Sequence, residues 1–191
     1  MSDLGSPHTL DDAELARVRA DLDLEIGGEP AGRLSLRFWP ETAPATVRNF
    51  LRYCAEGFYD GLGFHRVIEG FMMQGGCPLG TGSGSGPHGT IPGEFSTDPA
   101  RSHRRGVISM ARSSDPDSAS CQFFICHADA GFLDGQYAAF GEVVDGIEVV
   151  DRVCATPCGP GGDGARSRPL APVRIAGVHL RLAGTEEEKE G

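Results

Sequence analysis

The stretch GFHRVIEGFMMQGG, residues 63–76, is the most informative part of this chain. It contains two strand-like runs, FHRVI and FMMQ, separated by a Glu-Gly turn signal. Alternate residues of a strand share a face, so we expect Met72 and Gln74 on one face and Met73 on the other. Both faces then hold apolar groups, and Arg66 adds a cation close by. This mixture predicts a small binding site, in which an apolar pocket has a polar group at its edge.

The composition is typical of a globular domain without a membrane segment. The chain has 191 residues, of which 39% are hydrophobic and 23% charged, enough for one domain with a sizeable core. No apolar run reaches membrane-spanning length, and the first residues lack a basic start and a hydrophobic stretch. A net charge of −10 argues against a nucleic-acid surface. We therefore expect a cytoplasmic monomer that binds neither nucleic acid nor membrane.

The six cysteines favour free thiols, because the sequence shows no secretory segment that would indicate an oxidising compartment. Cys154 and Cys158 form a C-x3-C pair, but no histidine or second cysteine pair lies at ligand spacing, which disfavours a metal site. The segment SSDPDSAS, residues 113–120, lacks the twelve-residue calcium-loop pattern and is interpreted as a polar turn. The sequence predicts no metal.

Three segments follow one another along the chain. Residues 1–17 are predicted to be an appended arm with a short helix, for which Thr9 and Asp12 resemble a capping box. Residues 18–182 form the main domain. The acidic tail, residues 183–191, is expected to be disordered because it has almost no apolar side chains.

The main domain alternates between short strands and two helices. Apolar residues at every second position predict strands, and recurrence at every third or fourth position predicts helices. Besides the two runs above, the predicted strands are residues 21–26, 33–38, 106–111, 122–126, 138–144 and 173–182. One helix starts after a Thr42 cap, with Pro44 in its first turn, and ends near Gly57; the other spans residues 146–153 and is capped by Asp145. Such a pattern indicates a closed or nearly closed antiparallel barrel.

Three polar features allow a functional interpretation but favour a structural one. The glycine-rich segment 80–90 lacks the lysine and the following helix of a phosphate-binding loop, so we interpret it as a mobile surface loop. The basic run 101–105 is either a contact for an acidic partner or, the favoured interpretation, a solvated loop. His65 alternates to the strand face opposite Arg66 and is predicted to be a hydrogen-bonded structural histidine rather than a general base.

The segment QFFIC, residues 122–126, repeats the peculiarity of the opening stretch. Phe123 and Ile125 share one face, while Gln122 and Phe124 share the other. If the first pair feeds the core, an aromatic ring beside an amide is left outside it. Residue types alone favour a helix or loop that simply covers Phe124; a second wall of the binding site is the alternative.

Four long motifs resemble the cyclophilins, a family of peptidyl-prolyl cis-trans isomerases. They are GFHRVIEGFMMQGG, RGVISMAR, SCQFFIC and LDGQYAAFGEVVDGIEVVD, and they occur in that family's order and spacing. The resemblance covers roughly residues 21–182, which is most of the chain. It implies a mainly β fold, a closed eight-stranded antiparallel barrel capped by two α-helices, with the substrate groove on the outer surface. It implies no cofactor, and its substrates are proline-containing peptides and proteins.

The resemblance also implies a role for each motif residue. Arg66 matches the catalytic arginine, and Phe71 and Gln74 are placed with it in the catalytic group. The substrate-binding set is Met72, Ala111, Arg112, Gln122, Phe124, Phe132, Leu133 and Tyr137. By the resemblance, the wall of the proline pocket consists of Phe71, Met72, Phe124 and Leu133, and its rim of Phe132 and Tyr137. The amides of Gln74 and Gln122 position the substrate backbone and the arginine, and Ala111 and Arg112 offer their main chain to the residues before proline.

Several positions depart from the commonest family pattern. Arg112 stands where asparagine is usual, which predicts a preference for acidic neighbours of the proline. Phe132 replaces a frequent tryptophan, so the indole N–H is lost and only weak binding of cyclosporin-type inhibitors is expected. Tyr137 replaces a frequent histidine. Cys77 and Cys121 replace an aspartate and a serine, and both are interpreted as inert buried thiols rather than redox-sensitive groups.

Two other functions stay open at this point. A binding module or chaperone would use the same groove to hold proline-containing segments without turnover, but it would not need both Arg66 and Phe71. A barrel that holds a small hydrophobic ligand is disfavoured, because its interior positions are filled by residues such as Val107, Phe123 and Ile125. We therefore expect an isomerase that assists protein folding.

Overall fold

The first hairpin shows how the residue pattern builds the sheet. The computed structural model describes residues 9–184; in it, β1 (Val18–Ile26) and β2 (Glu29–Phe38) pair antiparallel across a turn at Gly27 and Gly28. Both glycines have positive φ angles, 62° and 90°, which other residues rarely adopt. Leu22 and Leu24 are buried, as the strict alternation of residues 21–26 predicted.

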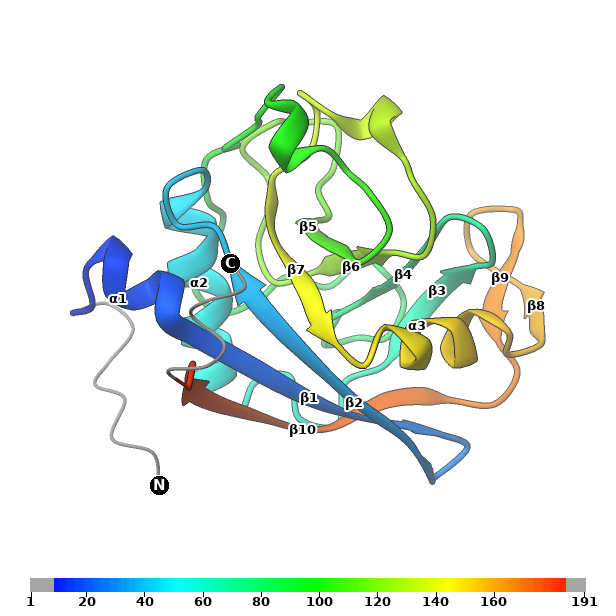
Figure 1. Ribbon diagram of the computed structural model, residues 1–191. Coiled ribbons are helices and arrows are strands. Elements are labelled where there is room, and N and C mark those ends of the chain that lie inside the picture. Colours follow the sequence, from blue (N-terminus) through cyan, green and yellow to red (C-terminus); the bar gives the residue numbers. More distant parts are fainter. Residues whose placement is uncertain (1–8, 185–191) are drawn as a thin grey trace.

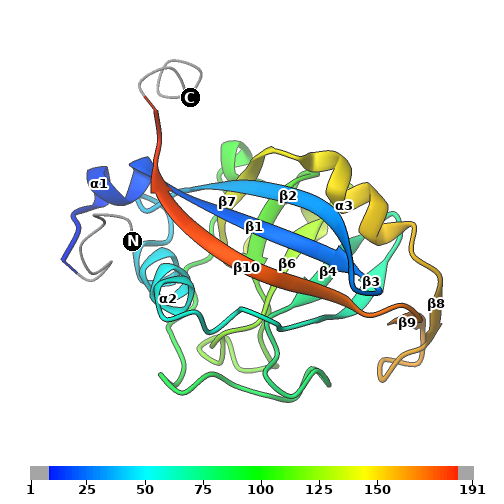
Figure 2. The same cartoon turned by 90° about the horizontal axis from the view of Figure 1, so that it is seen from below.

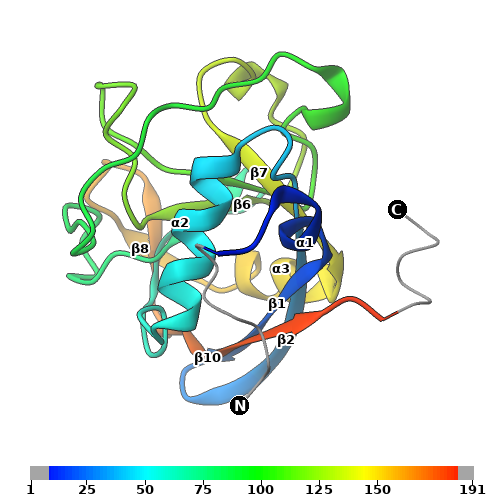
Figure 3. The same ribbon diagram turned by 90° about the vertical axis from the view of Figure 1, so that its left-hand side faces the viewer.

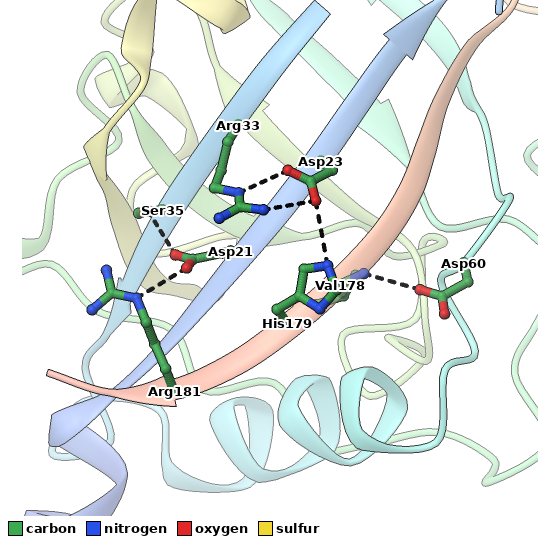
Figure 4. A network of polar contacts seen from close by, with 8 residues as sticks. All are labelled: Asp21, Asp23, Arg33, Ser35, Asp60, Val178, His179 and Arg181. Carbon is green, nitrogen blue, oxygen red and sulfur yellow. Dashed lines mark hydrogen bonds and ion pairs between the residues drawn. The ribbon is translucent and has the colours of Figure 1, made fainter. Parts of the chain in front are cut away.

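The polar residues that alternate with these leucines lie on the outer face of the hairpin. Figure 4 shows that Asp21 binds Ser35 and Arg181, with oxygen-to-donor distances of 2.6 and 2.9 Å. Asp23 accepts two hydrogen bonds from Arg33, at 2.7 and 2.9 Å. Apolar residues inside and paired charges outside therefore fix which face of the sheet is buried.

Eight strands form one antiparallel sheet, which confirms the mainly β class. Its strand order is β10-β1-β2-β7-β5-β6-β4-β3. The further strands are β3 (Phe64–Ile68), β4 (Met72–Gly75), β5 (Val107–Met110), β6 (Phe123–Cys126), β7 (Ala139–Asp145) and β10 (Val173–Leu182). All were expected near these positions, and β10 has the predicted bounds.

The sheet curls into a half-barrel, so the closed barrel that the sequence led us to expect overstates the closure. The edge strands are β10 and β3. In the part of the chain that the structure describes they form no ladder with each other, and one isolated bridge between Gly63 and Arg174 joins them. The interior is nevertheless filled, because Phe50, Phe123 and Phe140 pack there with ring centroids 5.3–5.4 Å apart.

Helices α2 (Pro44–Ala55) and α3 (Ile147–Cys154) lie on opposite sides of the curled sheet, as Figure 2 shows. The predicted side-chain caps are wrong for both. The residue that precedes α2 is Ala43, and the distant Glu94 carboxylate accepts the backbone N–H groups at its start. The residue before α3 is Gly146, whose φ of 82° suits a glycine and leaves Asp145 in β7.

The N-terminal helix α1 (Asp12–Arg17) is present, but its capping box consists of Asp11 and Glu14 instead of Thr9 and Asp12. Leu15 is fully buried in the main core, and Arg48 of α2 donates to the Leu10 carbonyl. Figure 3 shows α1 beside α2. The helical part of the arm is thus packed onto the domain. Residues 1–8, and the predicted disordered tail from residue 185 onward, lie outside the described residues.

A small hairpin follows α3 that the sequence did not predict. β8 (Cys158–Pro160) and β9 (Arg166–Pro169) pair antiparallel as a separate two-stranded sheet. In Figure 1 this hairpin lies beside β3, and the Cys158 thiol is 3.7 Å from the Val67 carbonyl. The hairpin therefore places residues 161–165 next to the strand that contains Arg66.

Two 3₁₀ helices, η1 (Pro99–Arg101) and η2 (Gly131–Leu133), interrupt the connections between β4 and β7. Within residues 9–184, no helix has both the length and the apolar character needed to cross a membrane.

Candidate functional site

A pocket of about 110 Å³ lies on the outer wall of the half-barrel. It is lined by Arg66, Phe71, Met72, Gln74, Ala111, Arg112, Phe124, Leu133 and Tyr137. All of them belong to the predicted site, of which only Gln122 and Phe132 lie outside this lining. The structure therefore brings together residues that are spread over 72 positions of the chain, of which Arg66 is the first and Tyr137 the last.

Strand register explains the convergence. Arg66 of β3 lies opposite Gln74 of β4, and Gln74 in turn lies opposite Phe124 of β6. Residues opposite each other in adjacent strands point to the same face. Their neighbours Met73 and Phe123 point the other way and are fully buried in the main core. The expected split of the two motifs between core and outer wall is confirmed.

The base of the pocket is a separate apolar cluster. Met72, Phe124, Cys126, Ala130 and Leu133 pack together there, apart from the main core. Phe124 is only 5% exposed, and the Tyr137 ring meets it edge-on with centroids 5.8 Å apart. The loop of residues 130–137 thus covers one side of the Phe124 ring, and ring and loop together form the pocket wall.

His103 packs against the Phe124 ring and is not among the residues that line the pocket. The two rings are stacked, with centroids 6.0 Å apart. His103 is 1% exposed; its Nδ1 lies 2.7 Å from an Asp134 oxygen, and its Nε2 lies 2.9 Å from the Ser109 hydroxyl. Burial lowers the pKa of His103, although Asp134 acts in the opposite direction. Sequence reasoning missed this support, since nothing near His103 in the chain indicates a partner in β6.

Arg66 is held at the pocket edge by a residue that sequence reasoning also missed. Its Nε donates to the Asp163 carboxylate at 2.6 Å, and its Nη1 lies 3.8 Å from the Met72 sulfur. Hydrogen bonds from Ser167 and Arg66 hold the pKa of Asp163 well below its usual range. The resemblance had assigned the positioning of the arginine to the glutamines, whereas here a carboxylate from the β8–β9 hairpin makes that contact.

The two glutamines bind each other instead. The Gln74 amide donates to the Gln122 oxygen at 3.2 Å, and the Gln122 amide donates to the carbonyls of Gly82 and Gly84 at 2.8 Å. Gln122 lines a second hollow, of about 260 Å³, that adjoins the pocket at Gln74, Ala111 and Arg112. The glycine-rich loop is therefore tied to the site at residues 82–84.

Arg112 and Phe132 form the rim. The Arg112 side chain lies over the Tyr137 ring, 4.8 Å from its centroid, and donates to the Gln136 carbonyl at 2.9 Å. Phe132 is 67% exposed, and its ring lies 5.6 Å from that of Phe71. A cation and an exposed aromatic ring thus flank the opening.

His65 lies away from the pocket, as its strand position predicted, but it is not fully hydrogen-bonded. Its Nδ1 is buried and has no partner within residues 9–184, so the expectation of a hydrogen-bonded histidine is wrong for this atom. Burial, and to a lesser degree Arg66, lowers its pKa. His65 borders a larger hollow of about 740 Å³ between β3 and the β8–β9 hairpin. Arginines and Phe64 line that hollow too, but no side-chain amide and no second phenylalanine or tyrosine does, so we assign the chemistry to the smaller pocket.

The cysteines are free in the described residues, and all but Cys158 are buried. Burial raises the pKa of Cys121 to about 11 and that of Cys126 to about 12. For Cys77, burial is outweighed by backbone N–H groups, among them those of Gly82 and Gly84 at 3.3 Å, and the pKa is lowered. No group of three or more His, Cys, Asp or Glu residues in the described chain is arranged to hold a metal ion.

An antiparallel half-barrel with an apolar pocket on its outer wall defines the class of protein to which this chain belongs. The family model described as cyclophilin type peptidyl-prolyl cis-trans isomerase matches residues 22–180. The chain therefore belongs to the cyclophilin-type isomerases, as the sequence motifs indicated.

Relatives and solved structures agree with this assignment. Peptidyl-prolyl cis-trans isomerase B of Bacillus subtilis is 47% identical over 120 residues, which are 63% of this chain and 82% of that protein. The isomerase CYP18-1 of Arabidopsis thaliana is 41% identical over 157 residues, 80% of this chain and 94% of the relative. A Cryptosporidium parvum cyclophilin, crystallised in the presence of the dipeptide Ala-Pro, has a TM-score of 0.75 at 29% identity and covers 85% of this chain and 98% of its own.

Proposed function

We propose that the pocket around Arg66 and Phe124 is the active site of this peptidyl-prolyl cis-trans isomerase and binds the proline of X-Pro segments in proteins. The observation that supports this most directly is the pairing of a buried apolar base with a guanidinium at its edge, where Arg66 Nη1 lies 3.8 Å from Met72. The pyrrolidine ring is apolar and fits the base, whereas the peptide group that rotates meets the cation.

The chemistry requires a donor that acts on the twisted amide. A peptide bond resists rotation by about 18–20 kcal/mol because resonance is lost in the twisted state. Uncatalysed X-Pro isomerisation therefore takes about 10–100 s at 25 °C. In the twisted state the prolyl nitrogen regains its lone pair, to which the Arg66 guanidinium donates a hydrogen bond. Because this bond exists mainly in the transition state, it lowers the barrier rather than only tightening binding.

The remaining lining holds the substrate while the bond turns. Phe71, Met72, Phe124 and Leu133 surround the ring, and Phe132 and Tyr137 border it. Gln74 lines the pocket and offers its amide to the substrate backbone, and Gln122 holds it there by accepting a Gln74 N–H. The main chain of Ala111 and Arg112 pairs with the residues before proline. The step needs no covalent intermediate, proton transfer, metal or cofactor.

Proline-containing peptides and proteins are the proposed partners, since the solved cyclophilin noted above was crystallised with Ala-Pro. Weak binding of cyclosporin-type inhibitors, a cytoplasmic location and a monomeric state stay predictions. A second function, the holding of proline-containing segments without turnover, uses the same groove. The position of Arg66 at the pocket edge favours catalysis, because a pure binder gains little from a donor aimed at a twisted amide.

The test is cis-trans exchange of an Ala-Pro peptide, measured by NMR with wild type, Arg66→Ala and Arg104→Ala. Arg104 is a matched control, because it is an exposed arginine that binds a carbonyl in its own loop. We expect acceleration by wild type and Arg104→Ala, and a loss of 100-fold or more in Arg66→Ala. If wild type binds the peptide but does not accelerate exchange, the protein holds proline-containing segments without turnover. If all three proteins accelerate exchange equally, Arg66 does not have the catalytic role proposed for it.

A further inference from the structure

Asp163 lies in the loop of the β8–β9 hairpin and reaches Arg66 across 97 positions of sequence. Its Oδ2 accepts from Arg66 Nε at 2.6 Å. Its Oδ1 accepts from the Ser167 hydroxyl at 2.7 Å and from the Ala165 backbone N–H at 3.1 Å. The carboxylate is therefore held by its own hairpin on one oxygen and binds the arginine with the other.

The hairpin is built to keep this carboxylate in place. Ser167 is 1% exposed, so its hydroxyl has a defined position. Gly161 donates to the Ala165 carbonyl at 2.8 Å, which closes the loop. A side chain at Gly161 would overlap the Ser167 hydroxyl and the Asp163 carboxylate, and Gly164 has a φ of 78°. Glycine at both positions lets the loop fold back onto Asp163.

The contact between Asp163 and Arg66 determines which N–H groups of the guanidinium face the pocket. A guanidinium has five N–H donors, one on Nε and two on each Nη. Asp163 occupies Nε, while Nη1 lies beside Met72 at the pocket. The Nη groups are thus left to the substrate, and the long side chain is held in one orientation. An arginine without such a partner loses up to about 2 kcal/mol of rotamer entropy when it is ordered.

We propose that Asp163 is a positioning residue for Arg66: it binds Nε so that the Nη groups meet the prolyl nitrogen of the twisted amide. This inference rests on the proposed function, in which Arg66 is the donor. Asp163 touches no substrate and acts through Arg66 alone. Its removal is expected to lower kcat, because the donor is misplaced in the transition state, and to leave KM nearly unchanged, because the apolar pocket still binds proline.

The experiment compares kcat and KM for an Ala-Pro peptide in wild type, Asp163→Ala, Asp163→Asn and Arg66→Ala, and in the double variant of Arg66→Ala with Asp163→Ala. Asp23→Ala is the matched control, since Asp23 also pairs with an arginine but lies on the outer face of β1 (Figure 4). We expect a five- to tenfold lower kcat in Asp163→Ala, a smaller loss in Asp163→Asn, which keeps an acceptor oxygen, and wild-type kinetics in Asp23→Ala.

Two readouts separate positioning from a structural role. In the Arg66→Ala background, Asp163→Ala is expected to cost nothing further, whereas a distorted pocket would lower the residual activity again. The ¹⁵Nε resonance of Arg66 is expected to shift in Asp163→Ala, with circular dichroism and Tm close to wild type. An unchanged kcat in Asp163→Ala, or an equal fall of activity in both backgrounds, would overturn the proposal. A wild type without any acceleration would instead overturn the proposed function, and with it the role of Asp163.

Discussion

The guanidinium carbon of Arg112 lies 4.8 Å from the centroid of the Tyr137 ring, so a fixed cation stands on the rim of the pocket proposed to bind proline. The same side chain lies 5.4 Å from the Phe95 ring and donates to the carbonyls of Gln136 and Ser113. Two rings and three carbonyls, the third that of Ser114 at 3.4 Å, hold the charge where the pocket meets the adjoining hollow. A substrate chain that leaves the pocket in this direction passes a positive charge.

This placement predicts a preference for acidic residues before the proline. A partly exposed ion pair contributes up to about 1 kcal/mol, which corresponds to about fivefold in kcat/KM. We expect kcat/KM to be two- to fivefold higher for Glu-Ala-Pro than for Lys-Ala-Pro peptides, and Arg112→Gln to abolish the difference. Exchange rates by NMR at low salt measure it, with Arg104→Gln as the charge-matched control. If Arg112→Gln still prefers the acidic peptide, a residue other than Arg112 causes the preference.

Phe132 predicts the response to cyclosporin-type inhibitors. Its ring is 67% exposed beside Phe71, and phenylalanine offers no hydrogen-bond donor. Phe132→Trp adds an indole N–H at the rim, and one net hydrogen bond is worth about 0.5–1.5 kcal/mol. We expect roughly two- to tenfold tighter binding of cyclosporin by calorimetry. Leu170→Trp adds the same indole at an exposed site away from this pocket and should not change the affinity; equal affinities of Phe132→Trp and wild type would contradict the prediction.

The carboxylate of Glu94 predicts a large stability effect outside the site. It accepts the backbone N–H groups of Ala45 and Thr46, at 3.0 and 2.8 Å, and the Thr46 hydroxyl at 2.7 Å. Glu94→Ala leaves the start of α2 without its cap and is expected to lower the free energy of unfolding by about 2 kcal/mol in urea titrations. Glu148→Ala removes only an exposed pair with Arg152 and should change it by less than about 0.5 kcal/mol.

His103 predicts how stability depends on pH. Its pKa is lowered in the folded protein, so the unfolded chain binds more protons as the pH falls through the unfolded value of about 6.5. Stability is therefore complete above this pH and is lost below it, by up to about 1.4 kcal/mol per pH unit for one histidine. Denaturation curves between about pH 7.5 and about pH 5.5, roughly one unit either side of the unfolded value, should show this slope.

His103→Gln tests the assignment, since it should flatten this pH dependence even though it lowers stability overall. Arg104→Gln, an exposed substitution that removes no group titrating in this pH range, should keep the wild-type slope. The same slope in His103→Gln and wild type would assign the effect to other groups, among them His65, whose pKa is also lowered.

Much of the fold and the pocket could be predicted from local pattern. The two runs of residues 63–76 became β3 and β4, and QFFIC divided its side chains between core and pocket as its alternation required. The motif residues met in one pocket because β3, β4 and β6 are neighbours in the sheet. For Phe124 the simpler interpretation, a ring merely covered by a loop, was incomplete, since loop and ring line the pocket together.

The misses share one physical cause. Thr42 and Asp145 were expected to cap the helices because they are next to them in the sequence. The start of α2 is instead capped by Glu94, which is 48 and 49 positions away from the N–H groups that it accepts. The start of α3 has Gly146, because the backbone there is left-handed. His65 was expected to find a partner from residue type alone, but its buried Nδ1 has none among residues 9–184. The closure of the barrel was overstated for the same reason, because the meeting of β10 with β3 depends on the curl of the whole sheet.

The sequence by itself determined the strands of the main sheet, the faces that they bury and the residues of the pocket, because a two-residue period and ordered motifs are properties of neighbouring positions. Only the tertiary structure decided which contacts hold the site in place. Asp163 accepts a hydrogen bond from Arg66, His103 stacks on Phe124, and Gln122 donates to the glycine-rich loop. Those contacts join residues 21 to 97 positions apart, as Phe124 with His103 and Arg66 with Asp163 show. The distances in these contacts depend on the curvature of the sheet and the paths of the loops, and neither can be predicted from one stretch of sequence.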